Sequence, residues 1–248
     1  MSNALEYLDL GWEEVGAGRD GEAADNARLS LAVDPMNPDA FVLLAATMPS
    51  RAERAALLRE AVRLCDRHGP VGLDHVPTRS RPGDVSSCRR ALHNLAIELW
   101  TGGGEAERHE AVALAKRLLR HEPYDGAGAR FLLMAWLPGI DRWLDAKRLA
   151  RRYSREQRTD TRYWIALHAL RDGDDDADEA ARAAIDTNPN VPAWLTLTTA
   201  PGMPDKAFVQ HGGKDEAQAY AAMAHEAWKR TPGALARLCR LAREMHGP

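Results

Sequence analysis

The stretch NPNVPAWLTL, residues 188–197, carries two prolines three positions apart, directly after the alanine-rich run DEAARAAIDT. Proline fixes φ and has no amide donor, so we expect Pro189 to end the preceding helix. Pro192 lies where a first-turn proline is tolerated, and we expect it to open the next helix. The stretch therefore predicts a joint between two helices, with Trp194 and Leu195 beginning the second one.

Similar proline-bearing joints recur along the chain, in AVDPMNPDAF (32–41) and RHEPYDGAGA (120–129). Each follows an alanine-spaced run and precedes an apolar one. Helix–turn–helix units of about 34 residues that end in proline are typical of tetratricopeptide repeats. Alanine, leucine, arginine and glutamate dominate, and no run shows the period-2 alternation of a strand. The sequence predicts an all-α, tetratricopeptide-like α-solenoid of about five to six helix pairs.

In the first predicted repeat, small residues and proline each have an expected structural role. We expect Gly11 and Ala23 to lie where the two helices cross, Gly18 to form the turn between them, and Pro35 to close the unit. A generic helical bundle remains the alternative. The solenoid is predicted as a single domain over residues 1–248, with an irregular insertion at about 66–88. The later units are expected at Asp39 to about Cys65, about Arg90 to Pro123, Gly126 to about Tyr153, Asp160 to Pro189, and Asp215 to Met245.

Composition limits the classes of protein that this chain can belong to. The net charge of −3 gives no electrostatic reason to bind nucleic acid or an anionic membrane. The N-terminus lacks a basic segment followed by an apolar one, and no apolar run approaches the ~20 residues of a membrane helix. The three cysteines are widely separated and odd in number, which favours free thiols in a reducing compartment. We therefore expect a soluble, cytoplasmic protein.

Four further segments are informative together: DAFVLLAA (39–46), NPNVPAWL (188–195), GGKDEAQAYA (212–221) and WKRTPGAL (228–235). In this order, over roughly residues 30 to 240, they resemble one family, the suppressor-of-tumorigenicity-seven proteins and their bacterial relatives. The resemblance implies a tetratricopeptide-like helical fold and supplies no enzymatic activity, cofactor or catalytic residue. The chain lacks the hydrophobic segments that precede the repeats in animal members, so a membrane location is not implied.

The insertion contains cysteines and histidines whose spacing resembles a metal site. Soft and borderline ligands at these separations can complete a tetrahedral zinc site. The competing interpretation is that the cysteines are small buried hydrophobic residues on helices and that the histidines belong to an exposed loop. We favour the second interpretation and expect no metal and no cofactor. The candidate ligands are Cys65, His68, His75, Cys88 and His93.

No catalytic motif accompanies the repeats, so the sequence favours a non-enzymatic scaffold that binds a protein or peptide in a concave groove. The alternative is an enzyme, or an accessory subunit of one, that uses the cysteine–histidine cluster. Arginines at positions 90 and 130 suggest an acidic or carboxylate-bearing partner, because the guanidinium matches carboxylate geometry. Each predicted groove residue has the alternative of being core or neutral surface. The predicted groove residues are Trp12, Arg90, His93, Asn94, Arg130, Tyr163 and Trp164.

Overall fold

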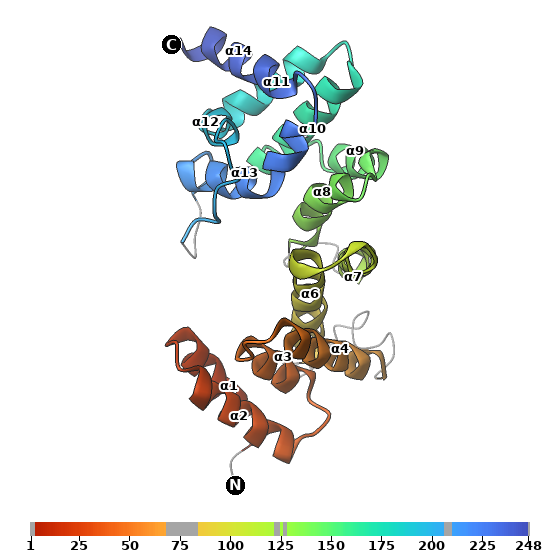
Figure 1. Cartoon of the computed structure of the whole chain (residues 1–248), viewed down its shortest axis with the longest axis vertical. Helices are drawn as coiled ribbons and strands as arrows, with labels where there is room; N and C mark the ends of the chain where they lie inside the picture. Colours follow the sequence, from red (N-terminus) through yellow and green to blue (C-terminus); the bar gives the residue numbers. More distant parts are fainter. Residues whose placement is uncertain (1–2, 68–83, 122–124, 126–127, 206–209, 248) are drawn as a thin grey trace. The chain divides into compact units, whose positions relative to one another are not determined.

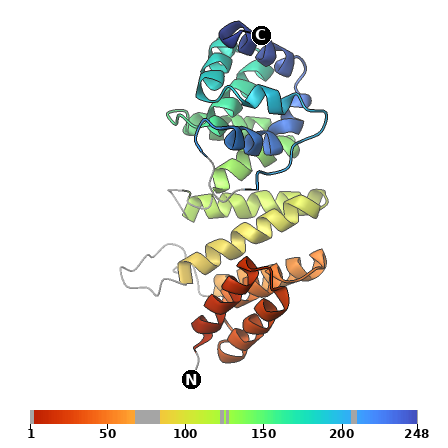
Figure 2. The same cartoon turned by 90° about the vertical axis from the view of Figure 1, so that its left-hand side faces the viewer.

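The computed structural model of the chain describes residues 3–67, 84–121, 125, 128–205 and 210–247. This described part contains thirteen helices and no strand, which confirms the predicted all-α fold (Figures 1 and 2). The helices form two compact units, Met1–Arg130 and Phe131–Pro248. That residues 1–248 act as one solenoid domain stays a prediction.

None of the described helices is long and apolar enough to cross a lipid bilayer.

Unit 1 consists of helices that pack in consecutive pairs. The first helix of each pair packs against the second, and neighbouring pairs meet through α2 with α3 and through α4 with α6. The predicted insertion is shorter than 66–88, because residues 66–67 end α4 and residues 84–88 begin α6. The pairs are α1 (Ala4–Gly16) with α2 (Asp20–Val33), α3 (Pro38–Ala46) with α4 (Arg51–Arg67), and α6 (Asp84–Gly102) with α7 (Glu105–His121).

The first pair follows the predicted pattern of small residues and turns. Gly11 is buried, and a Cβ at that position would collide with Cδ2 of Leu43 in α3 and approach Asn26 in α2. Ala23 is fully buried in α2. Gly18 has a φ of +73°, in the left-handed region that favours glycine. The turn is therefore where the sequence places it, whereas the closest approach at Gly11 is to α3 of the next pair and not to α2.

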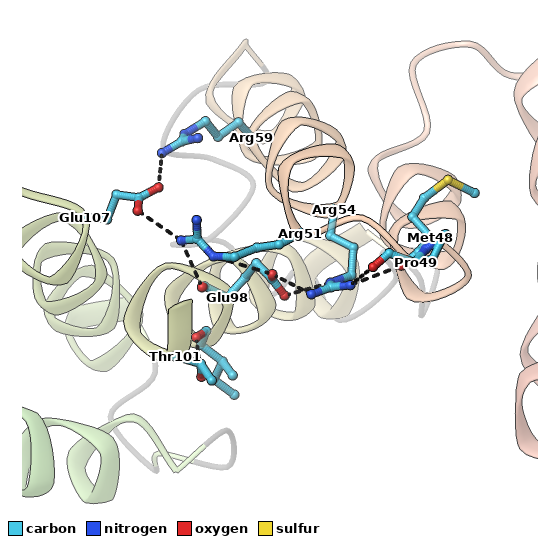
Figure 3. Close-up of polar contacts among 9 residues, drawn as sticks. Met48, Pro49, Arg51, Arg54, Arg59, Glu98, Thr101 and Glu107 are labelled. Carbon is cyan, nitrogen blue, oxygen red and sulfur yellow. Dashed lines mark hydrogen bonds and ion pairs between the residues drawn. The ribbon is translucent and has the colours of Figure 1, made fainter. Parts of the chain in front are cut away.

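An ion-pair network joins α4 to α6 and α7 (Figure 3). Arg54 holds both carboxylate oxygens of Glu98, with its Nε 3.0 Å from Oε2 and its Nη2 2.9 Å from Oε1. Arg51, one turn earlier, donates from Nη2 to Oε2 of Glu107 in α7 at 3.0 Å. Two-point contacts between arginine and carboxylate fix geometry as well as adding energy. The network therefore fixes how α4 meets the next helix pair.

Cys65 and Cys88 form a disulfide, so the prediction of free thiols for these two residues is wrong. They lie on α4 and α6, as predicted, and both are buried. Because α6 packs back against α4, their Cα atoms lie 5.7 Å apart despite a sequence separation of 23. That Cα separation is the usual one for a disulfide. The third cysteine, Cys239, is free.

Unit 2 is organised around α10, which packs against the helices on several sides of it. Residues buried on α10 include Tyr163, Trp164, Leu167 and His168, and α10 contacts α9, α11, α13 and α14. Unit 2 contains α8 (Ala129–Gly139, whose first two residues belong to unit 1), α9 (Trp143–Arg152), α10 (Thr159–Asp172), α11 (Ala177–Thr187), α12 (Val191–Leu195), α13 (Lys214–Lys229) and α14 (Ala234–His246).

The joint at residues 188–192 forms as predicted, although the helix that follows it is short. α11 ends at Thr187, and Pro192 lies in the first turn of α12. α12 ends at Leu195, so Trp194 and Leu195 close this helix instead of beginning a long one.

Asn188 explains why the joint is polar at its centre. Its side chain is fully buried, and Nδ2 donates to Oγ1 of Thr159 at 3.3 Å and to the carbonyl of Gly213 at 3.0 Å. Its Oδ1 accepts from the amide of Asn190 at 3.1 Å, and its carbonyl accepts from the Tyr163 hydroxyl at 2.7 Å. Asn188 therefore ties the beginnings of α10, α12 and α13 together.

Candidate functional site

The structure brings two of the predicted groove residues together in unit 1, around a carboxylate of the same chain. Nη1 of Arg90 lies 2.7 Å and 2.8 Å from the two carboxylate oxygens of Asp39. The guanidinium carbon of Arg90 lies 5.0 Å from the centre of the Trp12 ring. Burial raises the pKa of Asp39, and the nearby Arg90 charge opposes that rise. Arg90 therefore already has a carboxylate partner and an aromatic surface.

The other predicted groove residues of unit 1 lie elsewhere on α6 and at the start of α8. His93 and Asn94 are half-buried on α6. Nε of Arg130 lies 3.4 Å from Oδ2 of Asp125, whose side chain caps α8 by accepting from the amides of Ala129 and Arg130. Arg90 and Arg130 thus both face carboxylates of their own chain. The acidic partner inferred from these two arginines stays a prediction.

Tyr163 and Trp164 in unit 2 have different positions, although they are adjacent in sequence. Tyr163 has no exposed surface, and its hydroxyl is bonded to the joint at Asn188. This position does not fit the predicted groove-lining role, because the ring is enclosed by the core. Successive residues of an α-helix point about 100° apart. Trp164 is also largely buried, but it lines a cavity.

This cavity is the strongest candidate site in the described part of unit 2. It measures about 260 Å³. α8, α10 and α13 supply most of its walls, and α10 and α13 lie side by side in Figure 1. Its lining combines apolar, largely aromatic side chains with ionisable groups. The lining residues are Phe131, Arg158, Asp160, Trp164, His211, Glu216, Ala219, Tyr220 and Met223.

Asp160 is the cavity carboxylate whose pKa is shifted by its surroundings. It lies in the first turn of α10, where its Oδ1 accepts from the amide of Thr161 at 2.6 Å. Burial raises its pKa; the charge of Arg158, whose Nε lies 3.5 Å from Oδ1, lowers it, and Glu216 adds to the rise. A buried carboxylate with a shifted pKa in a cavity is a recognised mark of a functional site.

Glu216 faces the same cavity from the first turn of α13. Its Oε2 accepts from the hydroxyl of Thr159 and from the amide of Gly212, both at 2.7 Å. Nδ1 of His211 lies 3.1 Å from Oε1, and Nε2 of the same ring lies 3.4 Å from Nη1 of Arg158. Thr159 also accepts from Asn188. The joint at residue 188 therefore holds this side of the cavity in place.

The cavity can accommodate a group with an apolar stem and a polar end. Phe131, Trp164 and Tyr220 provide rings, and Met223 provides an adaptable apolar side chain. The guanidinium of Arg158 lies over the Phe131 ring, with its carbon 4.8 Å from the ring centre. This arrangement is suited to binding and orientation. Among the described residues it shows no nucleophile paired with a base.

Of the predicted groove residues, only Trp164 lines this cavity. Asp160 and Glu216 come from segments 56 positions apart, and sequence reasoning missed both. One signal was present, because Glu216, Ala219 and Tyr220 all lie within GGKDEAQAYA, one of the segments that carried the family resemblance. By itself the segment supports the fold prediction and does not indicate a cavity wall.

The candidate metal ligands that lie among the described residues do not form a site. Cys65 and Cys88 are joined to each other, so they cannot also act as thiolate ligands. His93 lies on α6, and His68 and His75 lie outside the described residues. Within the described ranges, no group of three or more histidine, cysteine, aspartate or glutamate side chains is arranged to hold a metal ion.

Ionisation of Asp160 gives a testable pH dependence. Because its pKa is raised above the ordinary value of 3.8, the folded state resists losing this proton more than the unfolded state does. The stabilising contribution is present below that ordinary value and is lost as pH rises through the raised pKa. We therefore expect Asp160→Asn, which cannot ionise, to raise the free energy of unfolding at pH 7, with a gain that shrinks toward pH ~4.

Urea titrations of both proteins at the two pH values measure this difference. A variant that is less stable than the parent by the same amount at both pH values would show that the hydrogen bonds of Asp160, and not its charge, decide its contribution.

Comparison of the chain with models of protein families, with curated proteins and with solved structures finds no match. No family is therefore identified, and the resemblance to the suppressor-of-tumorigenicity-seven proteins adds no argument about function.

Proposed function

We propose that the chain is a non-enzymatic scaffold of tetratricopeptide-like helix pairs that binds a protein or peptide. The consecutive pairing of helices within each unit supports this proposal, because stacked helix pairs present extended binding surfaces. The turn at Gly18 and the close crossing at Gly11 are the features that such repeats need. In this proposal the partner lies across α10 and α13.

The cavity lined by Trp164 and Tyr220 is the observation that carries the proposal. Its volume of about 260 Å³ is below the range of about 300–1,000 Å³ typical of pockets that enclose whole small ligands. One side chain of a longer partner fits that space. Binding energy at protein interfaces concentrates where an anchor residue fills such a pocket beside aromatic and arginine side chains. We therefore place the anchor of the partner here.

Selection of peptides from a random library on the immobilised full-length chain tests this function. We expect enrichment of a short motif with one recurring anchor residue. Synthetic peptides carrying the motif should shift the indole N–H signal of Trp164 in nuclear magnetic resonance spectra. The indole signal of Trp100 in unit 1 serves as the control and should stay in place. No enrichment, or peptides that bind without moving the Trp164 signal, would contradict the proposal.

A further inference from the structure

The cavity is lined by more carboxylates than guanidinium groups. Two carboxylates, Asp160 and Glu216, face it together with one guanidinium, that of Arg158. The imidazole of His211 lies between Arg158 and Glu216, with one nitrogen toward each. In that position a neutral ring donates from Nδ1 to Glu216 and accepts at Nε2 from Arg158. The cavity therefore has an excess of negative charge when both carboxylates are ionised.

The hydrogen bonds already present leave particular oxygens open to a ligand. Oδ1 of Asp160 is occupied by Thr161, but Oδ2 accepts no hydrogen bond from the described residues. Oε2 of Glu216 is occupied by two donors, and Oε1 has one partner among the described residues, His211, which leaves one of its two lone pairs open. Asp160 thus offers Oδ2, and Glu216 offers the remaining lone pair of Oε1. A planar guanidinium prefers two oxygens of one carboxylate, whereas a compact ammonium with three donors suits single oxygens from two carboxylates.

The apolar walls suit the rest of such a group. Lysine has a flexible four-carbon stem that covers apolar surface while its charged end stays with polar partners. The faces of Trp164, Tyr220 and Phe131 attract a cation through their π-electrons. A carboxylate in the same place would meet two like charges. Shape, open acceptors and charge therefore favour the same ligand chemistry.

We propose that the cavity selects a lysine side chain of the partner, with its ammonium held between Asp160 and Glu216 and its stem against Trp164 and Tyr220. This inference rests on the proposed peptide-binding function and names the anchor residue. Arg158 is the resident cation of the site, because its Nε lies 3.5 Å from Oδ1 of Asp160. It competes with the incoming ammonium.

Two variants with opposite expected effects test whether the cavity binds a positively charged group. The probe is n-butylammonium, which reproduces the lysine stem and charge, and binding to the full-length chain is followed by the Trp164 indole signal. Asp160→Asn should weaken this binding about tenfold, the effect of losing one charged hydrogen-bond partner. Arg158→Gln should tighten it about threefold, because the competing charge is removed. Glu179→Gln is the matched control, an exposed carboxylate on α11 away from the cavity, and should change binding less than about twofold.

Butyrate, an anion of similar length, is the probe of opposite charge. Saturable binding of butyrate that Arg158→Gln abolishes would overturn the lysine assignment and leave peptide binding intact. Failure of both fragments to shift Trp164 while library peptides shift it would also overturn the lysine assignment alone. If neither fragments nor library peptides shift the signal, the peptide-binding function itself fails.

Discussion

Replacing Tyr163 by alanine is expected to lower the free energy of unfolding of unit 2 by about 3–5 kcal/mol, the usual cost of removing a buried aromatic side chain. Tyr163 has no exposed surface, and its ring lies 5.3 Å from that of Tyr220 and 6.3 Å from that of Trp228, measured between ring centres. The truncation removes these contacts and the hydrogen bond to Asn188. Urea unfolding followed by circular dichroism measures the loss.

Tyr163→Phe separates the two contributions. It keeps the ring and removes only the hydroxyl, so we expect a loss of about 1 kcal/mol, because the Asn188 carbonyl keeps its hydrogen bond from the amide of Val191 at 3.5 Å. An alanine variant as stable as the parent that no longer binds selected peptides would make Tyr163 a contact residue and place it back in the predicted groove.

Removing the disulfide of unit 1 is expected to have the second largest effect. Cys65 and Cys88 close a loop with a sequence separation of 23, and the chain-entropy model gives a stabilisation of about 3 kcal/mol for a loop of that length. Replacing both cysteines by alanine should therefore lower the unfolding free energy of unit 1 by about 3 kcal/mol, with an added packing loss because both side chains are buried.

Cys239→Ala is the matched control, because Cys239 lies in unit 2 and is not paired. A reducing agent should destabilise the parent and the Cys239→Ala variant equally and should not affect the double variant. Equal unfolding curves for parent and double variant under oxidising conditions would contradict the stabilising role of the disulfide.

Features that depend on local chain conformation could be read from the sequence. The backbone limits of proline predicted where α11 ends and α12 begins. Gly18 was predicted at a turn because few other residues adopt its φ, and the structure places it there. The second helix that the sequence predicts in each helix pair is present for the same reason, because alanine spacing and flanking turns are both local signals. The all-α class followed from these elements.

Features that depend on contacts between distant segments could not be read in this way. The disulfide requires α6 to return against α4, and nothing within either helix indicates that return. The cavity requires the first turns of α10 and α13 to lie close together, so that Asp160 and Glu216 line the same cavity. Tyr163 and Trp164 show the same limit through helix rotation. Repeat register placed both on one surface, whereas the helix turns one into the core and the other to the cavity.

Isothermal titration of a library-selected peptide into a cavity-filling variant tests the proposed function most directly. Ala219 lines the cavity from α13, and Ala222, three residues further along the same helix and similarly half-buried, does not. We expect Ala219→Phe to weaken peptide binding at least about tenfold, because the phenyl ring occupies the space of the anchor, and Ala222→Phe to bind within about twofold of the parent. Ala219→Phe that keeps the helicity of the parent and binds the peptide as tightly would show that the partner does not use this cavity.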